Sequence, residues 1–427
     1  MKNAVLSALL VSLAAAAPHL EPRAARYEGY KVLRMETGGE LERVKEMLSG
    51  FDYEEWSHDA SKHIDFSLPA DQAKKLKSMG VEVKELHSDL GKDIADEGRP
   101  SSYKKGKKKP KDLPDISWYD GYHFYDEHLE YLDDLSSAFP KNSEVFTAGH
   151  SYEGRGQKGI HLWGKRGRGK NTAILWHGTV HAREWITTMT VEYLAYQLID
   201  GYKKKDPAIR AFLDAYDFYL MPVVNPDGFV YTQTQDRLWR KNRTPPAPGA
   251  NTSHTCWGVD LNRNWPHEWV GPGSSNNSCS LTYRGPSPGS EPEMSGMQHF
   301  ADKLAAKHGL KLFIDWHSYS QLILSPYGYS CEAIAETNEE HVDLMAATAE
   351  AIESVYGTEY VYGPTCQTIY ATNGGSSDYA YDISGAEWSM AFELRDTGNY
   401  GFILPPEQIL PNCEEIWAGM QVMLSKL

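Results

Sequence analysis

Apolar residues in the first hundred positions recur with the spacing of short strands and helices. Four segments have the pattern of strands: 30–35, 53–56, 63–68 and 81–86. Two others, 40–48 and 71–79, carry their apolar residues at helical spacing. The resulting order of strand, helix, strand, strand, helix and strand predicts a small ferredoxin-like α+β domain.

From residue 115 onward the pattern changes to apolar strands that alternate with longer helices. Segments 172–176, 217–224 and 312–316 are largely apolar, as strands buried on both faces are, whereas 190–201 and 291–308 have a helical pattern. We therefore expect one α/β domain with a mixed, mostly parallel twisted sheet and helices on both faces. In such sheets, candidate functional residues gather just past the strand ends.

A basic segment separates the two units. Residues 99–114 are rich in lysine and contain glycine and proline, so the segment should stay extended and solvated. Exposed polar linkers are where proteases cut, and a trypsin-like protease would cut after one of these lysines. An inert linker is the alternative interpretation.

Residues 1–17 begin with Lys2 and continue as an apolar, alanine-rich run. This is the pattern of a secretory signal peptide, and a buried N-terminal helix is the alternative. The run is too short to span a bilayer comfortably, and no later stretch is long and apolar enough to do so. We therefore expect a secreted, extracellular protein without a membrane partner.

Composition agrees with a folded extracellular protein and argues against nucleic acid as a partner. Hydrophobic residues make up 41% of the 427, enough for a sizeable core. Residues 1–111 carry 20 basic and 18 acidic side chains, so the remainder of the chain carries the negative charge and would repel a polyanion. Five cysteines fit an oxidising compartment, although their pairing cannot be read from sequence alone.

Three residues have the chemistry of a catalytic metal site. His181 and Glu184 are three positions apart, and His317 follows 133 positions after Glu184. Two imidazoles and one carboxylate suit zinc, and three protein ligands leave a coordination position open for chemistry. His177 lies four positions before His181, but Gly178 and the β-branched pair after it argue against a helix there. We therefore interpret His177 as structural.

Six motifs follow one another in an order that resembles a known family. They are His-Ala-Arg-Glu at 181–184, Leu-Trp-Arg-Lys-Asn-Arg at 238–243, Gly-Val-Asp-Leu-Asn-Arg-Asn-Trp at 258–265, His-Ser-Tyr at 317–319, Ile-Tyr-Ala-Thr-Asn-Gly-Gly at 369–375 and Phe-Glu-Leu-Arg-Asp-Thr-Gly at 392–398. Together they resemble the secreted zinc carboxypeptidases of the carboxypeptidase A/B type, in precursor form. The resemblance is strong from about residue 115 onward and rests on arrangement alone before it. It implies one Zn²⁺ per chain, held by the family's own His₂Glu set, here His181, Glu184 and His317.

The resemblance also implies a role for other residues of these motifs. Glu393 would act as the general base, and Arg240 would stabilise the oxyanion of the transition state. Asn262 and Arg263 would bind the terminal carboxylate of a peptide, which a guanidinium can grip bidentately. The remaining assignments are Tyr370 closing over the ligand, Arg183 and Tyr319 in the substrate cleft, and Asp260 orienting a ligand imidazole.

Ser377 is the residue expected at the base of the side-chain pocket. In the family an aspartate at this position marks a preference for terminal Lys or Arg, and an aliphatic residue marks a preference for apolar ends. Serine carries no charge, nor do Gly328 and Thr365, which the resemblance also places in the pocket. We therefore expect a preference for apolar and aromatic C-terminal residues. Asp315 is the one acid that could favour a basic end, and we interpret it as structural, since a buried unpaired acid is costly.

The expected function is hydrolysis of the C-terminal peptide bond of peptides and proteins by a zinc exopeptidase made as an inactive proenzyme. By resemblance, residues 18–98 are an inhibitory prodomain, 99–114 the activation linker and 115–427 the enzyme domain. A Lys/Arg-specific carboxypeptidase is the first alternative. An inactive peptide-binding homologue is the second, and the presence of all the ligands and the base argues against it.

The resemblance also suggests how the cysteines pair. Cys256 would bond with Cys279 and Cys331 with Cys366, which leaves Cys413 as a buried free thiol. Three glycosylation sequons occur, and they start at Asn242, Asn251 and Asn276. Asn242 lies inside a site motif, so we expect it to stay unmodified.

Overall fold

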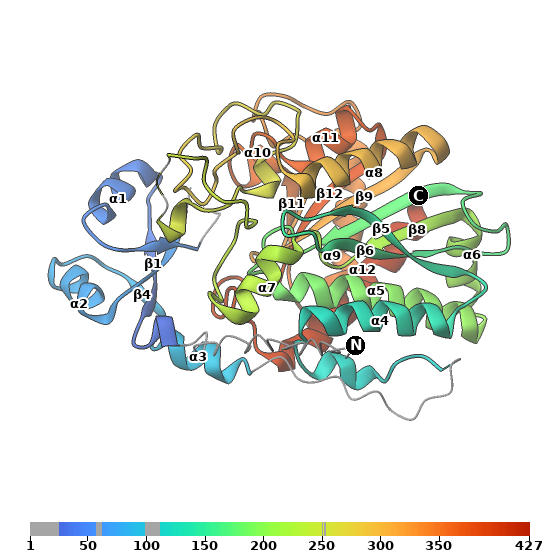
Figure 1. Cartoon of the computed structure of the whole chain (residues 1–427), viewed down its shortest axis with the longest axis horizontal. Coiled ribbons are helices and arrows are strands. Elements are labelled where there is room, and N and C mark those ends of the chain that lie inside the picture. The colour runs from blue at the N-terminus through green and yellow to red at the C-terminus, as the bar shows by residue number, and fades with distance from the viewer. Residues whose placement is uncertain (1–24, 57–61, 99–111, 250, 252) are drawn as a thin grey trace, which may run out of the picture.

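The computed structural model describes residues 25–56, 62–98, 112–249, 251 and 253–427. The expected signal peptide and most of the expected activation linker lie outside these ranges. Figure 1 shows a small unit, drawn in blue, beside one end of a much larger α/β unit.

The small unit has the element order that the sequence predicts. β1 (Lys31–Glu36), α1 (Leu41–Leu48), β2 (Glu54–Glu55), β3 (His63–Leu68), α2 (Ala70–Ser78) and β4 (Lys84–His87) follow one another along the chain. They form an antiparallel sheet in the order β2-β3-β1-β4. Leu33, Ile64 and Phe66 are fully buried in a core shared with α1 and α2. The strand expected at 53–56 is shortened to two residues, and α3 (Leu90–Asp96) adds a helix that the pattern did not indicate.

The large unit is built on an eight-stranded mixed sheet. Its strands are β5 (Ser143–His150), β6 (Gly156–Leu162), β7 (Thr172–Gly178), β8 (Tyr216–Met221), β9 (Leu310–Ser318), β10 (Leu322–Ser325), β11 (Val361–Pro364) and β12 (Ala386–Leu394). They lie in the order β11-β10-β12-β9-β7-β8-β6-β5. The four central strands, β12, β9, β7 and β8, run parallel to one another, whereas β6 and β5 join antiparallel at one edge. The prediction of a mixed, mostly parallel sheet is confirmed.

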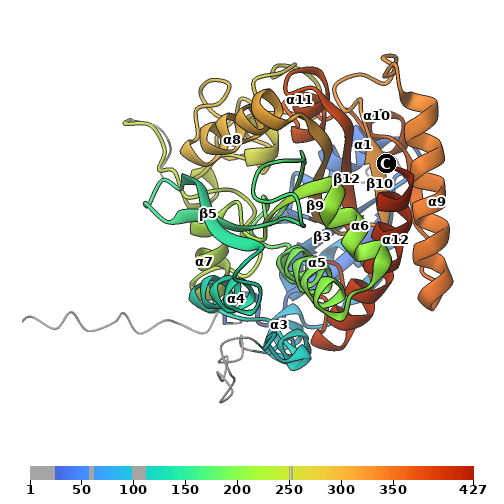
Figure 2. The same ribbon diagram turned by 90° about the vertical axis from the view of Figure 1, so that its right-hand side faces the viewer.

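Helices cover both faces of this sheet because alternate strand residues point to opposite sides (Figure 2). Ile174 and Trp176 of β7 pack in one apolar core, with α4 (Tyr125–Ala138), α5 (Trp185–Lys204), α6 (Pro207–Ala215), α9 (Asn338–Tyr356) and α12 (Ile409–Lys426). Ala173 and Leu175 pack in the other, with α8 (Pro292–His308) and α11 (Ser376–Asp382). The shorter helices are α7 (Pro226–Thr234), α10 (Thr365–Thr368), η1 (Ala25–Tyr27), η2 (Ile116–Asp120), η3 (His254–Cys256), η4 (Leu261–Arg263) and η5 (Pro406–Gln408).

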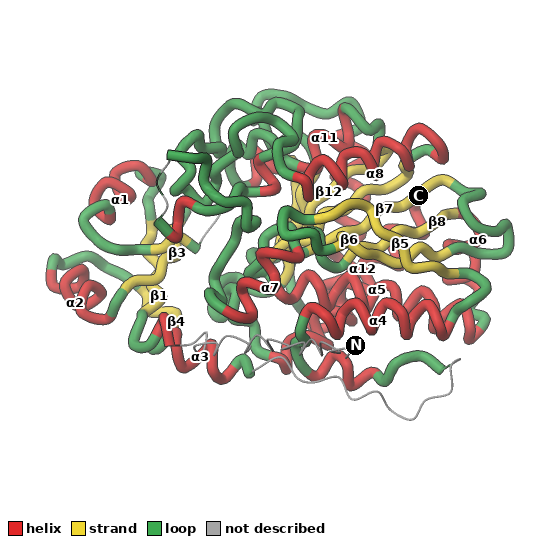
Figure 3. The backbone as a smooth tube through the Cα atoms, viewed as in Figure 1, coloured by secondary structure: helices red, strands yellow, loops and turns green. Residues whose placement is uncertain are grey.

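The C-terminal ends of the central strands bring the motif residues together. β7 ends at Gly178, just before His181 and Glu184, and β9 carries His317 near its own end. Glu393 of β12 lies directly opposite His317 in the register of the two parallel strands. Figure 3 shows that loops gather at this end of the sheet, between it and the small unit.

Both expected disulfides are present, Cys256–Cys279 and Cys331–Cys366. Cys413 is buried and unpaired, as expected. Among the described residues, no helix has both the length and the apolar character needed to cross a bilayer.

Candidate active site

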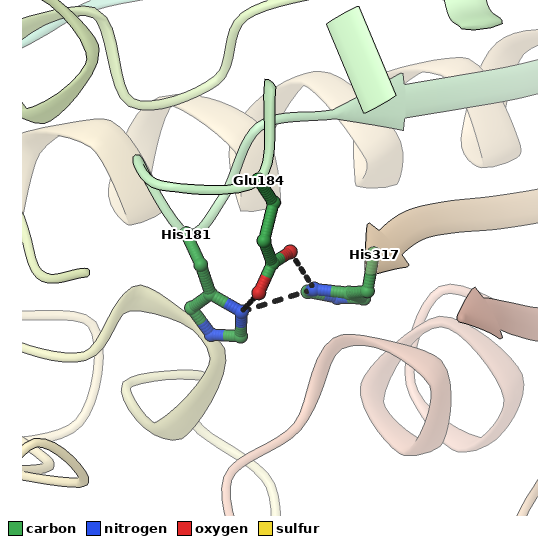
Figure 4. Close-up of side chains that lie close together, drawn as sticks. All are labelled: His181, Glu184 and His317. Carbon is green, nitrogen blue, oxygen red and sulfur yellow. Dashed lines mark hydrogen bonds and ion pairs between the residues drawn. The ribbon is translucent and has the colours of Figure 1, made fainter. Parts of the chain in front are cut away.

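His181, Glu184 and His317 converge on one point at the end of the central strands (Figure 4). One potential ligand atom from each lies within 4.8 Å of the other two. Nδ1 of His181 is 2.8 Å from one oxygen of Glu184, and Nδ1 of His317 is 3.1 Å from the other. The two Nδ1 atoms are themselves 3.1 Å apart. All three side chains are buried, so the cluster lies in an environment shielded from bulk water.

The Nε2 atoms of the two imidazoles lie on the side away from this point, and each of them faces a second carboxylate. Nε2 of His181 lies 3.1 Å from Oδ1 of Asp260, and Nε2 of His317 lies 2.9 Å from Oδ2 of Asp315. With a metal at the point of convergence, each Nε2 would donate to its carboxylate, which only accepts hydrogen bonds, and each Nδ1 would offer its lone pair to the metal. Two lone pairs and a carboxylate that converge in this way fit zinc and its preferred nitrogen and oxygen ligands.

Glu184 is held as a carboxylate by its neighbours. Burial raises the pKa of Glu184, but the adjacent imidazoles of His181 and His317 outweigh burial and lower the pKa overall. The backbone N–H of Ser318 also points at Glu184, at 3.3 Å. The charged form is the form that binds a metal.

Arg240 lies against the same cluster. Its Nη2 donates to Oδ2 of Asp260 at 2.9 Å, and its Nη1 is 4.0 Å from Oε1 of Glu184. Asp260 therefore contacts both Arg240 and His181, and it starts η4 by accepting from the backbone N–H of Asn262. A single carboxylate thus positions an imidazole, a guanidinium and the turn that carries Asn262 and Arg263.

Glu393 faces the cluster from β12. Its Oε2 is enclosed and has no hydrogen-bond partner within the described part of the chain. Burial raises the pKa of Glu393 to about 8, with nearby Glu184 adding to the rise and both His317 and Arg240 opposing it. A carboxyl group with its pKa near neutrality is suited to both taking and giving a proton.

Asn262 and Arg263 line the same cavity as His181, His317 and Glu393. Oδ1 of Asn262 accepts from the backbone N–H of Ser376 at 2.8 Å. The guanidinium of Arg263 donates to the carbonyl oxygens of Gly273 and Asn262, each at 2.8 Å. These bonds fix both side chains at the cavity wall beside the metal-ligand cluster.

A sequence model of the peptidase family described as zinc carboxypeptidase matches residues 128–419 of this chain. The chain belongs to the zinc carboxypeptidase family. It is 43% identical to metallocarboxypeptidase A of Trichophyton rubrum over 428 residues, which covers 99% of this chain and 97% of that relative. It is 39% identical to carboxypeptidase A4 of Mus musculus over 351 residues, or 82% and 79% of the two chains. Membership of the family implies one catalytic zinc ion, and the donor set described above fits it.

Solved structures extend the similarity to the small unit. The crystal structure of thrombin activatable fibrinolysis inhibitor superposes with a TM-score of 0.81 at 28% identity, covering 94% of this chain and 98% of that one. Carboxypeptidase A from Helicoverpa armigera superposes with a TM-score of 0.76 at 26% identity, covering 93% and 97%. This carboxypeptidase therefore shares its fold with them along nearly its whole length.

The cavity of the carboxypeptidase also has a wall of mostly uncharged residues, here called the side pocket. Tyr370 and Ser377, both expected in the substrate site, line it. Gly328 and Thr365 lie there too, and the remaining lining is contributed mainly by Leu324, Ile369, Thr372, Asp378 and Ala391. Uncharged side chains thus make up most of the pocket wall.

Asp378 is a pocket acid that the sequence analysis missed. Both of its oxygens lie 2.9 Å from the backbone nitrogen of Gly328, and one also accepts from the N–H of Tyr329. Burial raises the pKa of Asp378 to about 6, against the lowering effect of these backbone donors. Its position next to Ser377 was the available signal, but the backbone groups that hold it come from a distant segment.

Arg183 and Tyr319 lie outside the side pocket and contact the small unit. Nη1 of Arg183 is 3.8 Å from Oε1 of Glu54 in β2, and its guanidinium packs on the ring of Phe402 at 4.0 Å. The hydroxyl of Tyr319 donates to Oδ2 of Asp65 in β3 at 3.0 Å. Both residues are buried, because the small unit covers them.

The two residues interpreted as structural are placed as expected. His177 lies behind the cluster, with Nδ1 3.3 Å from Oδ1 of Asp315, and it is not among the three residues that converge. Asp315 is fully buried and paired with histidines rather than exposed in the pocket. Burial opposes ionisation of Asp315, but His317 and His177 lower its pKa to about 2.

Proposed function

We propose that this zinc carboxypeptidase is a secreted proenzyme that removes apolar and aromatic residues from the C-terminal ends of peptides and proteins. The observation that carries the proposal is the single cavity that joins three elements. These are the converging lone pairs of His181, Glu184 and His317, the donors Asn262 and Arg263, and an uncharged pocket.

In this proposal each residue of the site has a separate role in peptide hydrolysis. Zinc, held by His181, Glu184 and His317, would activate water and polarise the scissile carbonyl. Glu393 takes the proton from that water and passes it to the leaving amine. Arg240 stabilises the negative charge that develops on the carbonyl oxygen, from a position fixed by Asp260.

Recognition of the last residue follows from the cavity wall. Asn262 and Arg263 bind the terminal carboxylate, and Tyr370 closes over the bound residue. On the other side of the scissile bond, Arg183 and Tyr319 contact the remainder of the peptide. The requirement for a free carboxylate makes the enzyme an exopeptidase.

The side pocket supports a preference for apolar ends. Ser377 and its uncharged neighbours offer no partner for a terminal ammonium or guanidinium. Of the two acids in the lining, Glu393 is the proposed base, and Asp378 is already held by backbone N–H groups. A preference for Lys or Arg is the alternative, and it would require Asp378 to leave these donors.

We also propose the precursor organisation 1–17 signal peptide, 18–98 prodomain, 99–114 activation linker and 115–427 enzyme. Support comes from the small unit, which covers Arg183 and Tyr319, and from a similar structure whose name describes it as thrombin activatable. The activating protease would be trypsin-like, and the sequons at Asn251 and Asn276 would carry the sugar. Asn242 is fully buried, which supports leaving it unmodified.

The test is hydrolysis of N-blocked dipeptides that end in Phe, Leu or Lys, by the purified full chain before and after trypsin. We expect little turnover before trypsin, turnover of Phe and Leu substrates at least about tenfold above Lys afterwards, and complete loss with a zinc chelator. Trypsin alone is the control. A preference for Lys overturns the pocket argument, activity that survives the chelator overturns the zinc mechanism, and full activity before trypsin overturns the proenzyme.

A further inference from the structure

Asp315 links a proposed zinc ligand to the wall of the substrate pocket. It lies two residues before His317 in β9, so both side chains point to the same face of the sheet. Oδ2 of Asp315 accepts from Nε2 of His317 at 2.9 Å and from the hydroxyl of Ser376 at 2.6 Å. One oxygen atom therefore contacts both a neighbour on its own strand and Ser376, which lies 61 positions away from Asp315.

The link continues from Ser376 to the residues that bind substrate. Ser376 is the first residue of α11, and the next residue, Ser377, lines the pocket. The backbone N–H of Ser376 donates to Oδ1 of Asn262, and Nδ2 of Asn262 lies 3.2 Å from Nε2 of His317. His317, Asp315, Ser376 and Asn262 thus form a closed ring of contacts.

The other oxygen of Asp315 faces inward. Oδ1 lies 3.3 Å from Nδ1 of His177, which is the residue opposite Asp315 in the register of β7 and β9. The Asp315 side chain has no exposure to solvent, so its position is set by His177 behind it and by His317 and Ser376 in front. A buried carboxylate is costly unless it is paired and hydrogen-bonded, and Oδ2 has both an ion-pair partner, His317, and a hydrogen-bond donor, Ser376.

We propose that Asp315 is a positioning residue that sets the orientation of the His317 imidazole and the start of α11 together. It would strengthen zinc binding, because a carboxylate that accepts from the outer nitrogen orients the ring and increases its basicity as a ligand. It would also hold the pocket wall through Ser376. The inference rests on the proposed role of His317 as a ligand.

The first measurement is zinc affinity of the full chain, by competition with a chelator, for Asp315→Asn. Loss of a carboxylate behind a metal-ligating histidine costs about 10- to 100-fold in metal affinity, and we expect that range. The absorption spectrum of the cobalt-substituted protein should change as well, since it reports the geometry of the ligands. If Asp315→Asn fails to fold, Asp315→Ser takes its place with the same expectations.

Two further variants separate the contact of Asp315 with the pocket wall from its contact with His317. Ser376→Ala removes only the hydrogen bond between Asp315 and the pocket wall. Zinc affinity should therefore stay within about threefold of the wild type, while KM for a Phe-ending substrate rises several-fold at unchanged kcat. Asp217→Asn is the matched control. Asp217 is equally buried, and its Oδ1 lies 2.7 Å from Nε2 of His161. It lies near the start of β8, away from the site. It should leave zinc affinity unchanged.

The outcomes discriminate between this proposal and the ligand assignment. Zinc affinity of Asp315→Asn within about twofold of the wild type, or an equal loss in Asp217→Asn, overturns the role of Asp315. An unchanged KM in Ser376→Ala overturns the link to the pocket. His317→Ala tests the ligand set itself: it should abolish zinc binding, and full zinc affinity there would refute the ligand assignment regardless of how Asp315→Asn behaves.

Discussion

Glu393 is the side chain best placed for proton transfer, and Glu393→Gln isolates that role. The substitution keeps shape but removes the basic oxygen, so kcat should fall by about 10²- to 10⁴-fold. Zinc content should stay at one ion per chain, because Glu393 is not among the three converging residues. The measurements are kcat on a Phe-ending substrate and zinc per protein.

The control for this prediction lies on the same strand. Glu387 of β12 is exposed and pairs with Lys311 at the surface, so Glu387→Gln applies the same chemical change away from the cavity. It should retain wild-type kcat. A Glu393→Gln enzyme with kcat within a few-fold of the wild type would exclude Glu393 as the base.

At the level of single residues, the motifs predict the cluster and several of its neighbours, but not the contacts of Asp315 and Asp378. His181, Glu184 and His317 are identifiable because each lies in a run whose neighbours mark it. The partners of Asp315 are not identifiable in this way. His177 comes from β7 and is brought opposite Asp315 by the sheet register, whereas Ser376 comes from the start of α11. Polar pairs between distant segments leave no periodic trace in the sequence, which is why the Asp378 contacts were also missed.

At the level of elements, three strands of the large unit could be predicted because they are largely apolar runs buried on both faces. The central strands β7, β8 and β9 are largely apolar runs, since helices cover both sides of them, and all three were anticipated. The edge strand β11 was not, because Val361 and Tyr362 are exposed and the strand has only four residues. Helix α3 was missed for a related reason: its buried residues face the large unit rather than the core of its own unit.

The first turn of α8 carries a buried acid, Glu293, that makes the stability of the folded state depend on pH. Glu293 is fully buried, and Asn242 donates to it and to Glu291. Burial raises the pKa of Glu293 from 4.5 to about 7, while the hydrogen bonds oppose the rise and Glu291 adds to it. The folded state therefore holds this proton at a pH where the unfolded chain has lost it. Its stabilising contribution is complete below about pH 4.5 and is lost as pH rises through 7.

Glu293→Gln removes this titration. Relative to the wild type, the free energy of unfolding of the variant should rise between pH 5 and pH 8, by at most about 3 kcal/mol. Thermal unfolding of both proteins across this range measures the difference. Glu350→Gln, an exposed change on α9, is the control. Wild-type and Glu293→Gln curves that stay parallel across the pH range would contradict the assignment.

At the scale of the whole molecule, adjacent residues of β1 point to opposite sides of the small unit, and one of these sides packs against the large unit. Leu33 of β1 faces α1 and α2, whereas the adjacent Val32 faces the large unit, in a cluster with Trp56. That cluster is completed by residues of the enzyme: Leu238, Tyr319, Phe402 and Ile403. This shared apolar core holds the small unit in one orientation over the cleft. The sequence predicted the small unit, but not that one of its faces packs against the large unit.

One ion pair anchors the end of the small unit. Glu97 follows α3 directly, and its two oxygens accept from Nε and Nη2 of Arg237 at 2.8 and 2.6 Å. Both side chains are fully buried. Arg237 also donates to the backbone oxygens of Arg183 and Phe402, so the pair connects the small unit to the part of the cleft that it covers. Removing one partner of such a pair costs about 3–5 kcal/mol.

Glu97→Gln should therefore weaken the seating of the small unit without touching the enzyme. We expect the intact variant to hydrolyse a small Phe-ending substrate at least about tenfold faster than the intact wild type, since 3 kcal/mol exceeds a hundredfold change in the docking equilibrium. After trypsin treatment the two proteins should be equally active, because a cut in the proposed linker 99–114 separates residue 97 from the enzyme and leaves the same enzyme in both. The control is Glu85→Gln, which affects ion pairs with Lys77 and Lys31, both inside the small unit. An intact Glu97→Gln chain that is no more active than the intact wild type would contradict a role of this ion pair in seating the small unit.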